Sequence, residues 1–409
     1  MFLSKIKLIY LLFVVYFLTG LVVYNDYGIG IEEHFQRQNG FYWLERILSY
    51  LDIEGLKILA LDKYQNIRSY DSNLPDSNIF NYYGIIFDVP LAFLEIFFKI
   101  DNSQLYFELR HLTSFFIFFI GSIFFYKILK KRFKKEIVVY TGTIFYIFTP
   151  RIFGDSFHNN KDILFLSILT IALFYLFKVL EKMSTKNIIL FCLFSAIASS
   201  SRIMGVYLPV LLIIFLFLEY LKQEIFLYYF FKKTAVILFF YIFFLYLHFP
   251  YMWELNILKI TDWFSVYFYN MELNILYNGA YYHIKYLPRL YLPLWISITT
   301  PLFILLLFIG GYILILKRFF QRILNITLTK KPFNDFWTSL NEKKDLFFFF
   351  SLTSFFIYAI FLNVSMLSGW RHFYFLHVFI IYIAAYMINI ILNFCKRKKI
   401  NIYTFYVSI

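Results

Sequence analysis

The stretch IKLIYLLFVVYFLTGLVVYNDYGIGIEEHFQRQNG, residues 6–40, places a long apolar run directly before a group of carboxylates. The apolar part, residues 6–24, is long enough to cross the roughly 30 Å of hydrocarbon in a bilayer. Asp26, Glu32 and Glu33 follow just past the expected membrane boundary, among glycines and aromatic residues. The stretch predicts a membrane span, and it raises the question of what three carboxylates do at that boundary.

The composition of the 409-residue chain excludes a water-soluble globule. Apolar side chains make up 61% of the residues and aromatic side chains 24%, which is more than a soluble fold can hide. The formal charge of +14 comes from Lys and Arg residues that cluster between apolar segments, so it indicates membrane topology and not nucleic-acid binding. Two cysteines, Cys192 and Cys395, support neither a disulfide framework nor a cysteine metal site.

Apolar segments recur along the whole chain. The candidate spans are residues 6–24, 109–127, 137–150, 162–180, 187–203, 205–221, 234–249, 290–316, 346–362 and 373–394. They predict an all-α, polytopic membrane protein of about ten transmembrane helices that forms a single domain over residues 1–409. The first segment is longer than the apolar region of a signal peptide and no A-x-A site follows it, so we expect a retained anchor.

Basic residues fall on alternate connections between these segments. They are Lys5 and Lys7, KKRFKK at 130–135, Lys182 and Lys186, Lys232 and Lys233, the stretch 317–331, and KRKK at 396–399. By the positive-inside rule these connections and both termini are predicted to be cytoplasmic. The opposite connections are then extracytoplasmic, and in the bacterial inner membrane that we favour they are periplasmic: 25–108, 151–161, 202–205, 250–289 and 363–372. Any chemistry is expected on that side.

The long loop 25–108 contains two stretches that predict helices lying along the membrane interface. In residues 41–62, FYWLERILSYLDIEGLKILALD, apolar residues recur at helical spacing with charged residues opposite. Residues 82–100, YYGIIFDVPLAFLEIFFKI, are almost long enough to span. However, Asp88, Pro90 and Glu95 disfavour a lipid-exposed helix, so this stretch is interpreted as surface-lying or re-entrant.

Further motifs follow these helices in order. They are the arginine-bearing start of a span in DNSQLYFELRHLTSFFIFF at 101–119, an acidic loop in TPRIFGDSFHNNKDILFLS at 149–167, a basic turn in SSSRIMGVYLPVL at 199–211, and GWRHFYFLHVFIIY at 369–382. Together with the acidic pair in IEEHFQRQNGFYWLERIL at 31–48, this series resembles the C-type (GT-C) membrane glycosyltransferases. That superfamily contains the aminoarabinose transferase of lipid A and the protein O-mannosyltransferases.

The resemblance implies an inverting transfer of a sugar from a polyprenyl-phosphate-linked donor to a lipid, glycan or protein acceptor, in mannosyltransferase-like enzymes of the cell envelope. It implies that the pair Glu32 and Glu33 supplies a catalytic carboxylate, and that Asp162 matches the family's second acid at the mouth of a span. Glu32 stands where the family usually has Asp, so the base stays open among Asp26, Glu32 and Glu33.

The residue types also fit this chemistry on general grounds. Sugar transfer from a phosphate carrier needs a carboxylate to accept the acceptor's proton and cations to hold the leaving phosphate. The candidate phosphate-binding residues are Arg151, Lys161, Arg202, Arg371 and His372. Because the histidines are scattered, we predict no metal site and no cofactor, with a role for a divalent ion left open. The expected partners are the lipid-linked donor, the acceptor and membrane lipids.

Other interpretations compete with an enzyme. A Glu pair at the start of a helix also complements the helix dipole, and Arg202 and Arg371 can be anchors that reach for the interface. A multi-pass transporter or lipid flippase is the competing class, although it should carry ionisable residues near the bilayer midplane and here they lie at span ends. A structural membrane subunit is the third class. The aromatic loop 250–289 fits either acceptor binding or an interfacial belt.

Overall fold

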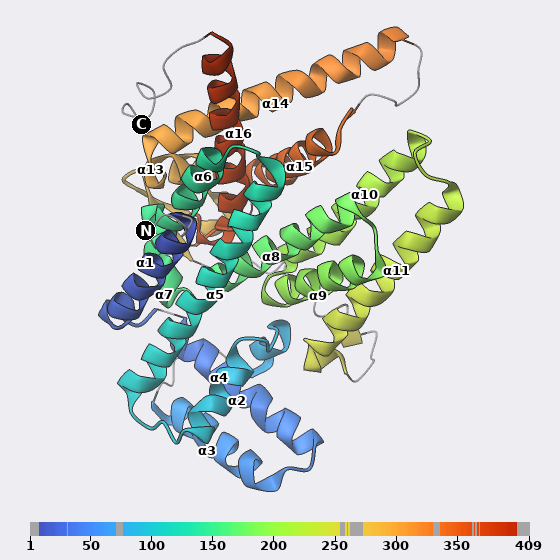
Figure 1. The fold of residues 1–409 in the computed structure, drawn as a ribbon. Coiled ribbons are helices and arrows are strands. Elements are labelled where there is room, and N and C mark those ends of the chain that lie inside the picture. Colours follow the sequence, from blue (N-terminus) through green and yellow to red (C-terminus); the bar gives the residue numbers. More distant parts are fainter. Residues whose placement is uncertain are drawn as a thin grey trace, which may run out of the picture.

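The computed structural model describes residues 8–30, 32–70, 77–253, 258–259, 261, 273–329, 336–361, 364, 366–367 and 369–398. Most of these residues form a bundle of long helices (Figure 1). In this part of the chain, eight helices are long and apolar enough to cross a membrane. These spans involve α1 (Leu8–Val23, continued by η2, Tyr24–Asp26), α5 (Ser103–Arg132), α8 (Asp162–Glu181), α10 (Tyr207–Leu221, preceded by η4, Ile203–Val206), α11 (Leu227–Leu247), α14 (Leu302–Thr329), α15 (Leu340–Phe361) and α16 (Leu376–Arg397). The prediction of an all-α, multi-pass membrane protein is confirmed.

Three of the predicted spans differ from a simple straight helix. α6 (Glu136–Phe148) and α7 (Pro150–His158) form a pair bent by 55°, because Pro150 lacks the N–H that would continue α6. α9 (Thr185–Ser201) has only 17 residues. The prediction of one helix over 290–316 is wrong, since α13 (Tyr291–Thr299) ends before Pro301 and α14 begins after it. Against the predicted count of about ten, the described residues contain eight candidate spans, or nine if the bent pair is one span.

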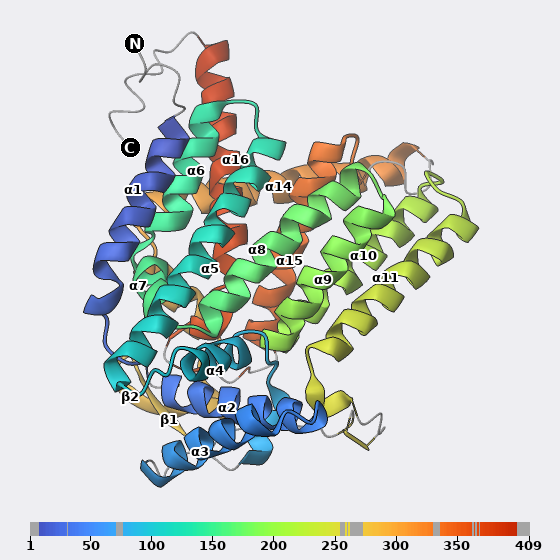
Figure 2. The same cartoon turned by 60° about the horizontal axis from the view of Figure 1, so that its bottom comes forward.

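Successive helices run up and down between two ends of the bundle. One end joins α5, α8 and α15 through ion pairs of Lys131 with Glu181 and of Lys344 with Glu181; we call it the basic end. The other end joins the start of α2 to η7 (Arg371–Phe373) through Glu32 and Arg371, and α8 to the end of α9 through Asp162 and Arg202; we call it the site end. The alternation of basic connections thus corresponds to a real separation in space (Figure 2). Which end faces the cytoplasm stays a prediction.

Helices α8 and α16 form the centre of the bundle. Almost all side chains of residues 162–179 and 376–386 are buried. Helices α1, α11 and α14 expose many of their apolar side chains on the outside, as lipid-facing helices do. Gly121 lets α5 approach α8 closely, because a Cβ there would lie 3.0 Å from the backbone of Ser167.

Three helices of the loop 25–108 cover the site end as a separate layer (Figure 2). They are α2 (Glu33–Tyr50), α3 (Glu54–Tyr70) and α4 (Asp88–Phe97), with η3 (Ser77–Tyr82) beside them. The apolar face predicted for residues 41–62 packs within this layer: Leu44 and Leu48 of α2 meet Ala60 of α3 and Ala92 of α4. The contact between α2 and α4 is so close that a Cβ at Gly40 would lie 2.5 Å from the carbonyl oxygen of Asp88.

The two acids of α4 are buried and paired inside the protein. Glu95 lies 2.8 Å from Nε of Arg37 and 3.5 Å from Arg110, while Asp88 lies 3.3 Å from Arg110 and accepts a hydrogen bond from Asn39. Helices α2 and α5 therefore supply the partners that allow Asp88 and Glu95 to sit in an otherwise apolar helix.

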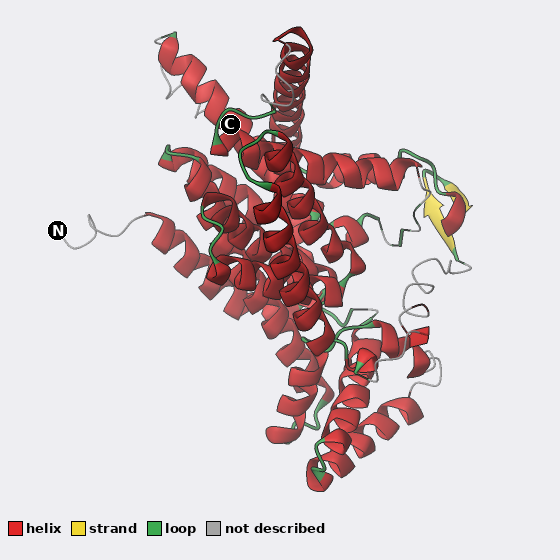
Figure 3. Ribbon diagram, turned by 90° about the vertical axis from the view of Figure 1, so that its right-hand side faces the viewer, coloured by secondary structure: helices red, strands yellow, loops and turns green. Residues whose placement is uncertain are grey.

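A small antiparallel hairpin was not predicted from the sequence. β1 (Asn274–Tyr277) pairs with β2 (Ala280–His283) and leads through η6 (Ile284–Tyr286) into α13 (Figure 3). Most of the preceding loop, including residues 254–257 and 262–272 after η5 (Pro250–Met252), lies outside the described residues, as do Lys5, Lys7 and the basic residues at 330–331. The prediction that this aromatic loop binds the acceptor or forms a belt therefore stays a prediction.

Candidate active site

A cavity of about 410 Å³ opens at the site end, between the start of α2, helix α7 and η7. Its wall brings together segments that lie more than 300 positions apart in the sequence. The charged residues that line it are Glu32, Glu33, Arg151, Asp155 and Arg371, and the amide side chains of Gln36, Asn159 and Asn160 lie beside them. The concentration of carboxylates, guanidinium groups and amides makes this cavity the candidate active site.

Glu33 is fixed by its surroundings on one side of its carboxylate. Its Oε2 accepts a hydrogen bond of 2.6 Å from the N–H of Gly30, and it lies 3.1 Å from Nε2 of His111 on α5. The side chain is 1% exposed, and Oε1 has no hydrogen-bond partner. Glu33 thus closes the turn that begins α2 and lines the cavity, while its Oε1 is buried without a hydrogen-bond partner.

Glu32 lies in the cavity among positive charges. Its carboxylate forms an ion pair with Arg371, and the side chain is 33% exposed. Burial disfavours the charged form of this carboxylate, but the positive charges of Lys161 and Arg371 outweigh that effect and lower the pKa of Glu32 below its usual value. Glu32 is therefore ionised at neutral pH. Asp26, the third acid of the opening stretch, is exposed and does not line the cavity.

Helix α7 contributes Asp155, an acid that the sequence analysis did not single out, beside the predicted Arg151. Asp155 accepts a hydrogen bond from the hydroxyl of Tyr374, and it lies 3.3 Å from Nε of Arg151 and 3.3 Å from Nε2 of His158. Arg151 also donates through Nε to Tyr374. Asp155 stands seven residues before Asp162 in the same acidic motif, and the one-turn spacing of 151, 155 and 158 was the signal that could have identified the group.

The predicted phosphate-binding residues fall into two sets. Arg151 and Arg371 line the cavity. Arg202 instead forms a buried ion pair with Asp162, and neither residue lines the cavity. Asp162 also accepts a hydrogen bond of 3.1 Å from Asn159, and its negative charge acts on Glu32 from behind the wall. The roles predicted for Asp162 and Arg202 stay predictions.

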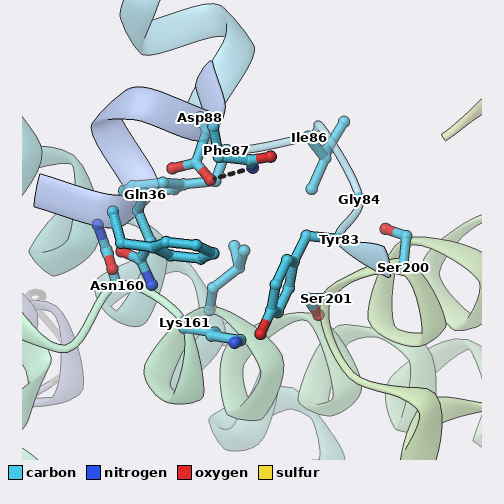
Figure 4. Close-up of a pocket in the computed structure, with 13 residues that line it drawn as sticks. Gln36, Tyr83, Gly84, Ile86, Phe87, Asp88, Asn160, Lys161, Ser200 and Ser201 are labelled. Carbon is cyan, nitrogen blue, oxygen red and sulfur yellow. Dashed lines mark hydrogen bonds between the residues drawn. The ribbon is translucent and has the colours of Figure 1, made fainter. Parts of the chain in front are cut away.

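Lys161 and His372, the other two predicted phosphate-binding residues, do not line the cavity, and they differ in charge. Nζ of Lys161 lies 3.8 Å from the ring centroid of Tyr83, in a smaller pocket that adjoins the cavity (Figure 4). Burial, together with the charges of Arg202 and Arg371, lowers the pKa of His372 well below its usual value. His372 is therefore neutral near pH 7 and can offer a phosphate a hydrogen bond but no charge.

Residues 89–251 match the family model described as dolichyl-phosphate-mannose-protein mannosyltransferase. This segment of the chain is similar to a family of GT-C membrane glycosyltransferases. Neither the curated proteins nor the solved structures gave a match to the chain. Enzymes of that family take their sugar from a dolichyl-phosphate-linked donor, as the description of the family states.

The segment that matches the family model supplies only some of the residues that line the cavity. It includes Arg151, Asp155 and the pair Asp162 and Arg202, whereas Glu32, Glu33 and Arg371 lie outside it. The fold places Glu32, Glu33 and Arg371 next to residues of the matched segment at the cavity. Within the described residues no group of three or more His, Cys, Asp or Glu side chains is arranged to hold a metal ion.

Proposed function

We propose that this membrane protein is a glycosyltransferase that moves a sugar from a polyprenyl-phosphate-linked donor to a hydroxyl of a lipid, glycan or protein acceptor, with inversion at the anomeric carbon. The observation that carries the proposal is the meeting of two acids, Glu32 and Glu33, with two guanidinium groups, Arg151 and Arg371, in one cavity. The cavity lies at the end of the bundle opposite the basic connections, which supports an extracytoplasmic site by the positive-inside rule.

Glu32 is the general base in this proposal. The acceptor hydroxyl gives its proton to the Glu32 carboxylate while its oxygen bonds to the anomeric carbon. The bond from that carbon to the phosphate oxygen breaks, and the phosphate leaves with the electron pair. Attack from the face opposite the leaving phosphate inverts the configuration. A positioned carboxylate base contributes typically about 10²- to 10⁴-fold in rate.

The ion pair between Glu32 and Arg371 links donor binding to the strength of the base. A donor phosphate is a strong partner for a guanidinium group, because it accepts two parallel hydrogen bonds. When Arg371 turns to the phosphate, Glu32 loses its ion-pair partner, and its pKa rises toward the range in which a carboxylate accepts protons more readily. Glu33 stays anchored on Gly30 and His111, and its Oε1 accepts a hydrogen bond that orients the acceptor.

Asp155 acts by positioning Arg151. The carboxylate and Tyr374 both contact Nε of Arg151, a residue that lines the cavity, and in this proposal the two terminal nitrogens of its guanidinium group bind the phosphate. Arg151 and Arg371 can then hold one phosphate from two sides.

The proposal is tested with the purified protein in lipid nanodiscs, using dolichyl-phosphate mannose labelled in the sugar and a membrane extract as the source of acceptors. Labelled product should form with the wild-type protein and not with the Glu32→Gln variant, and NMR of the product should show the inverted anomer. Movement of intact labelled lipid across the bilayer without any sugar transfer would support the flippase class in its place.

A further inference from the structure

A second, smaller pocket lies beside the catalytic cavity, and uncharged polar side chains line it together with apolar ones. It has a volume of about 30 Å³. Amide side chains come from α2 and from the turn before α8, serine hydroxyls come from the end of α9, and the aromatic ring of Tyr83 stands opposite them (Figure 4). We call it the amide pocket; the polar residues used below are Gln36, Asn39, Asn160, Lys161, Ser200 and Ser201.

The amide pocket contains buried hydrogen-bonding atoms that have no protein partner. Oε1 of Gln36, Oδ1 of Asn39 and Nδ2 of Asn160 are unpartnered, and the three residues are 6%, 1% and 3% exposed. An unmet buried amide costs roughly 1–3 kcal/mol, so native structures normally satisfy such groups. All three residues line the pocket, and their unpartnered atoms are two acceptors and one donor, so a group that pairs with them has to donate and accept, as a hydroxyl does.

The amide pocket and the catalytic cavity share part of their walls. Gln36 and Asn160 line both spaces, so these two side chains can contact one group of a molecule that is bound in the cavity. A volume of about 30 Å³ is on the order of two waters by the measure that assigns one water roughly 10–15 Å³. The pocket therefore accepts a hydroxyl or a hydroxymethyl group, while the sugar ring stays in the larger cavity.

The charges around the amide pocket disfavour an ionic group. Asp88 is neutralised by Arg110, which lies 3.3 Å away. Lys161 remains at the rim, where its positive charge opposes an amino group. The unpartnered amides are neutral and cannot compensate the desolvation of a carboxylate. Ser200 and Ser201 donate their hydroxyl protons to backbone carbonyls of α9, which leaves their oxygens as acceptors.

We propose that the amide pocket recognises one neutral hydroxyl of the transferred sugar, through Gln36 and Asn160, and thereby selects hydroxylated sugars over deoxy and amino sugars at that position. This inference rests on the proposed function, because it assigns the substrate class of the same site. Recognition of this kind discriminates strongly, since a sugar without the hydroxyl leaves the buried amides unpaired.

The test compares dolichyl-phosphate mannose with its 2-deoxy, 4-deoxy and 6-deoxy analogues in the wild-type protein and in Gln36→Leu and Asn160→Leu. In the wild type, removal of one hydroxyl should lower kcat/KM by roughly 10- to 100-fold, while the other two removals have less effect. In both Leu variants the ratio of kcat/KM for the mannose donor to kcat/KM for this deoxy donor should fall toward one, because the pocket no longer forms hydrogen bonds with the hydroxyl.

Gln38→Leu is the matched control. Gln38 is also a buried amide of α2 without hydrogen-bond partners, but it lines neither the cavity nor the amide pocket. Its substitution should leave the ratio between the donors at the wild-type value. A ratio that is the same in all four proteins would overturn the inference, since the pocket would then hold only water.

A binding measurement separates this inference from the proposed function. The shift in melting temperature caused by each lipid-linked sugar reports binding without any transfer. One outcome is that no donor supports transfer, that dolichyl-phosphate mannose raises the melting temperature further than one of the deoxy analogues does, and that Gln36→Leu removes this difference. In that case the proposed function is wrong and the inference about the amide pocket is supported. If transfer occurs but neither assay distinguishes the analogues, the inference fails and the proposed function stands.

Discussion

The two ends of the bundle both carry many charged side chains, but they hold them in different ways. At the basic end, Asp345 is fully buried and accepts bonds of 2.7 and 2.8 Å from Arg132, with Arg318 at 3.3 Å and the hydroxyl of Tyr382 at 2.8 Å. Each oxygen of that carboxylate is used. At the site end, Oε1 of Glu33 has no partner.

The cations show the same contrast. Arg132 at the basic end donates through Nε and Nη2 to the two oxygens of one carboxylate, and Lys344 is buried against Glu181. Arg151 at the site end contacts Tyr374 and Asp155 through Nε, and its side chain, which lines the cavity, is 41% exposed. Charges whose bonding capacity is filled by the protein stabilise the fold, whereas charges with unused capacity at a cavity wall are available to a substrate.

The largest expected effect comes from removing the proposed base. Glu32→Gln keeps the shape of the side chain but cannot accept a proton, so kcat should fall by about 10²- to 10⁴-fold while the protein still inserts and folds. Sugar transfer under saturating donor measures the effect. Asp26→Asn is the matched control, because Asp26 is an exposed acid of the same stretch outside the cavity and its loss should leave kcat unchanged. A Glu32→Gln protein with wild-type kcat would refute the assignment.

The contrasting substitution at the basic end should affect stability and not catalysis. Asp345→Asn leaves Arg132 and Arg318 without their carboxylate, and breaking a buried ion pair in this way costs about 3–5 kcal/mol of unfolding free energy. Thermal unfolding in detergent should show the loss, while kcat per folded molecule stays at the wild-type value. A selective loss of kcat with unchanged stability would show that the division between the two ends is wrong.

Substitutions of three arginines at the site end compare residues that line the cavity with one that is paired behind it. Arg371→Ala and Arg151→Ala should each weaken donor use by about 1.5–3 kcal/mol, which corresponds to roughly 10- to 150-fold in kcat/KM for the donor. Arg202→Ala should act differently: it leaves Asp162 buried without its ion-pair partner, so the melting temperature should fall. If all three substitutions lowered kcat/KM for the donor equally, Arg202 would have to be interpreted as a phosphate-binding residue.

Much of the fold follows from patterns that the sequence carries openly. Apolar segments and alternate basic connections identified the spans, because the lipid environment demands continuous apolar helices. Breaks at prolines were harder to read. Pro301 divides a continuous apolar stretch into α13 and α14, and Pro150 bends α6 against α7, although neither changes the hydropathy of the segment.

The candidate site was harder to predict, since its members meet only through tertiary packing. The acidic pair and Arg371 were proposed from motifs, and the structure places all three at the cavity. Asp155 was missed because Asp162, at the start of a span, was the more conspicuous acid of the motif. Sequence alone does not reveal that Asp162 faces Arg202 while Asp155 faces the cavity. The pairing of side chains, more than their positions along the chain, separates the two roles.

The smallest expected effect concerns pH and uses the charges around Glu32. The base must be ionised in the free enzyme, so kcat/KM is at its plateau above the pKa of Glu32 and falls as the pH drops through it. Lys161 and Arg371 hold that pKa below its usual value, so the wild-type plateau should extend into the acid range. Arg371→Ala removes one of these positive charges and should move the acid limb of the profile toward neutral pH. Arg318→Ala, which removes a guanidinium group at the basic end, should leave the limb in place. The measurement is the profile of kcat/KM between pH 4 and 8 for the wild type and both variants. If the acid limb of Arg371→Ala stays at the wild-type pH or moves further into the acid range, Glu32 is not the group whose ionisation controls the rate.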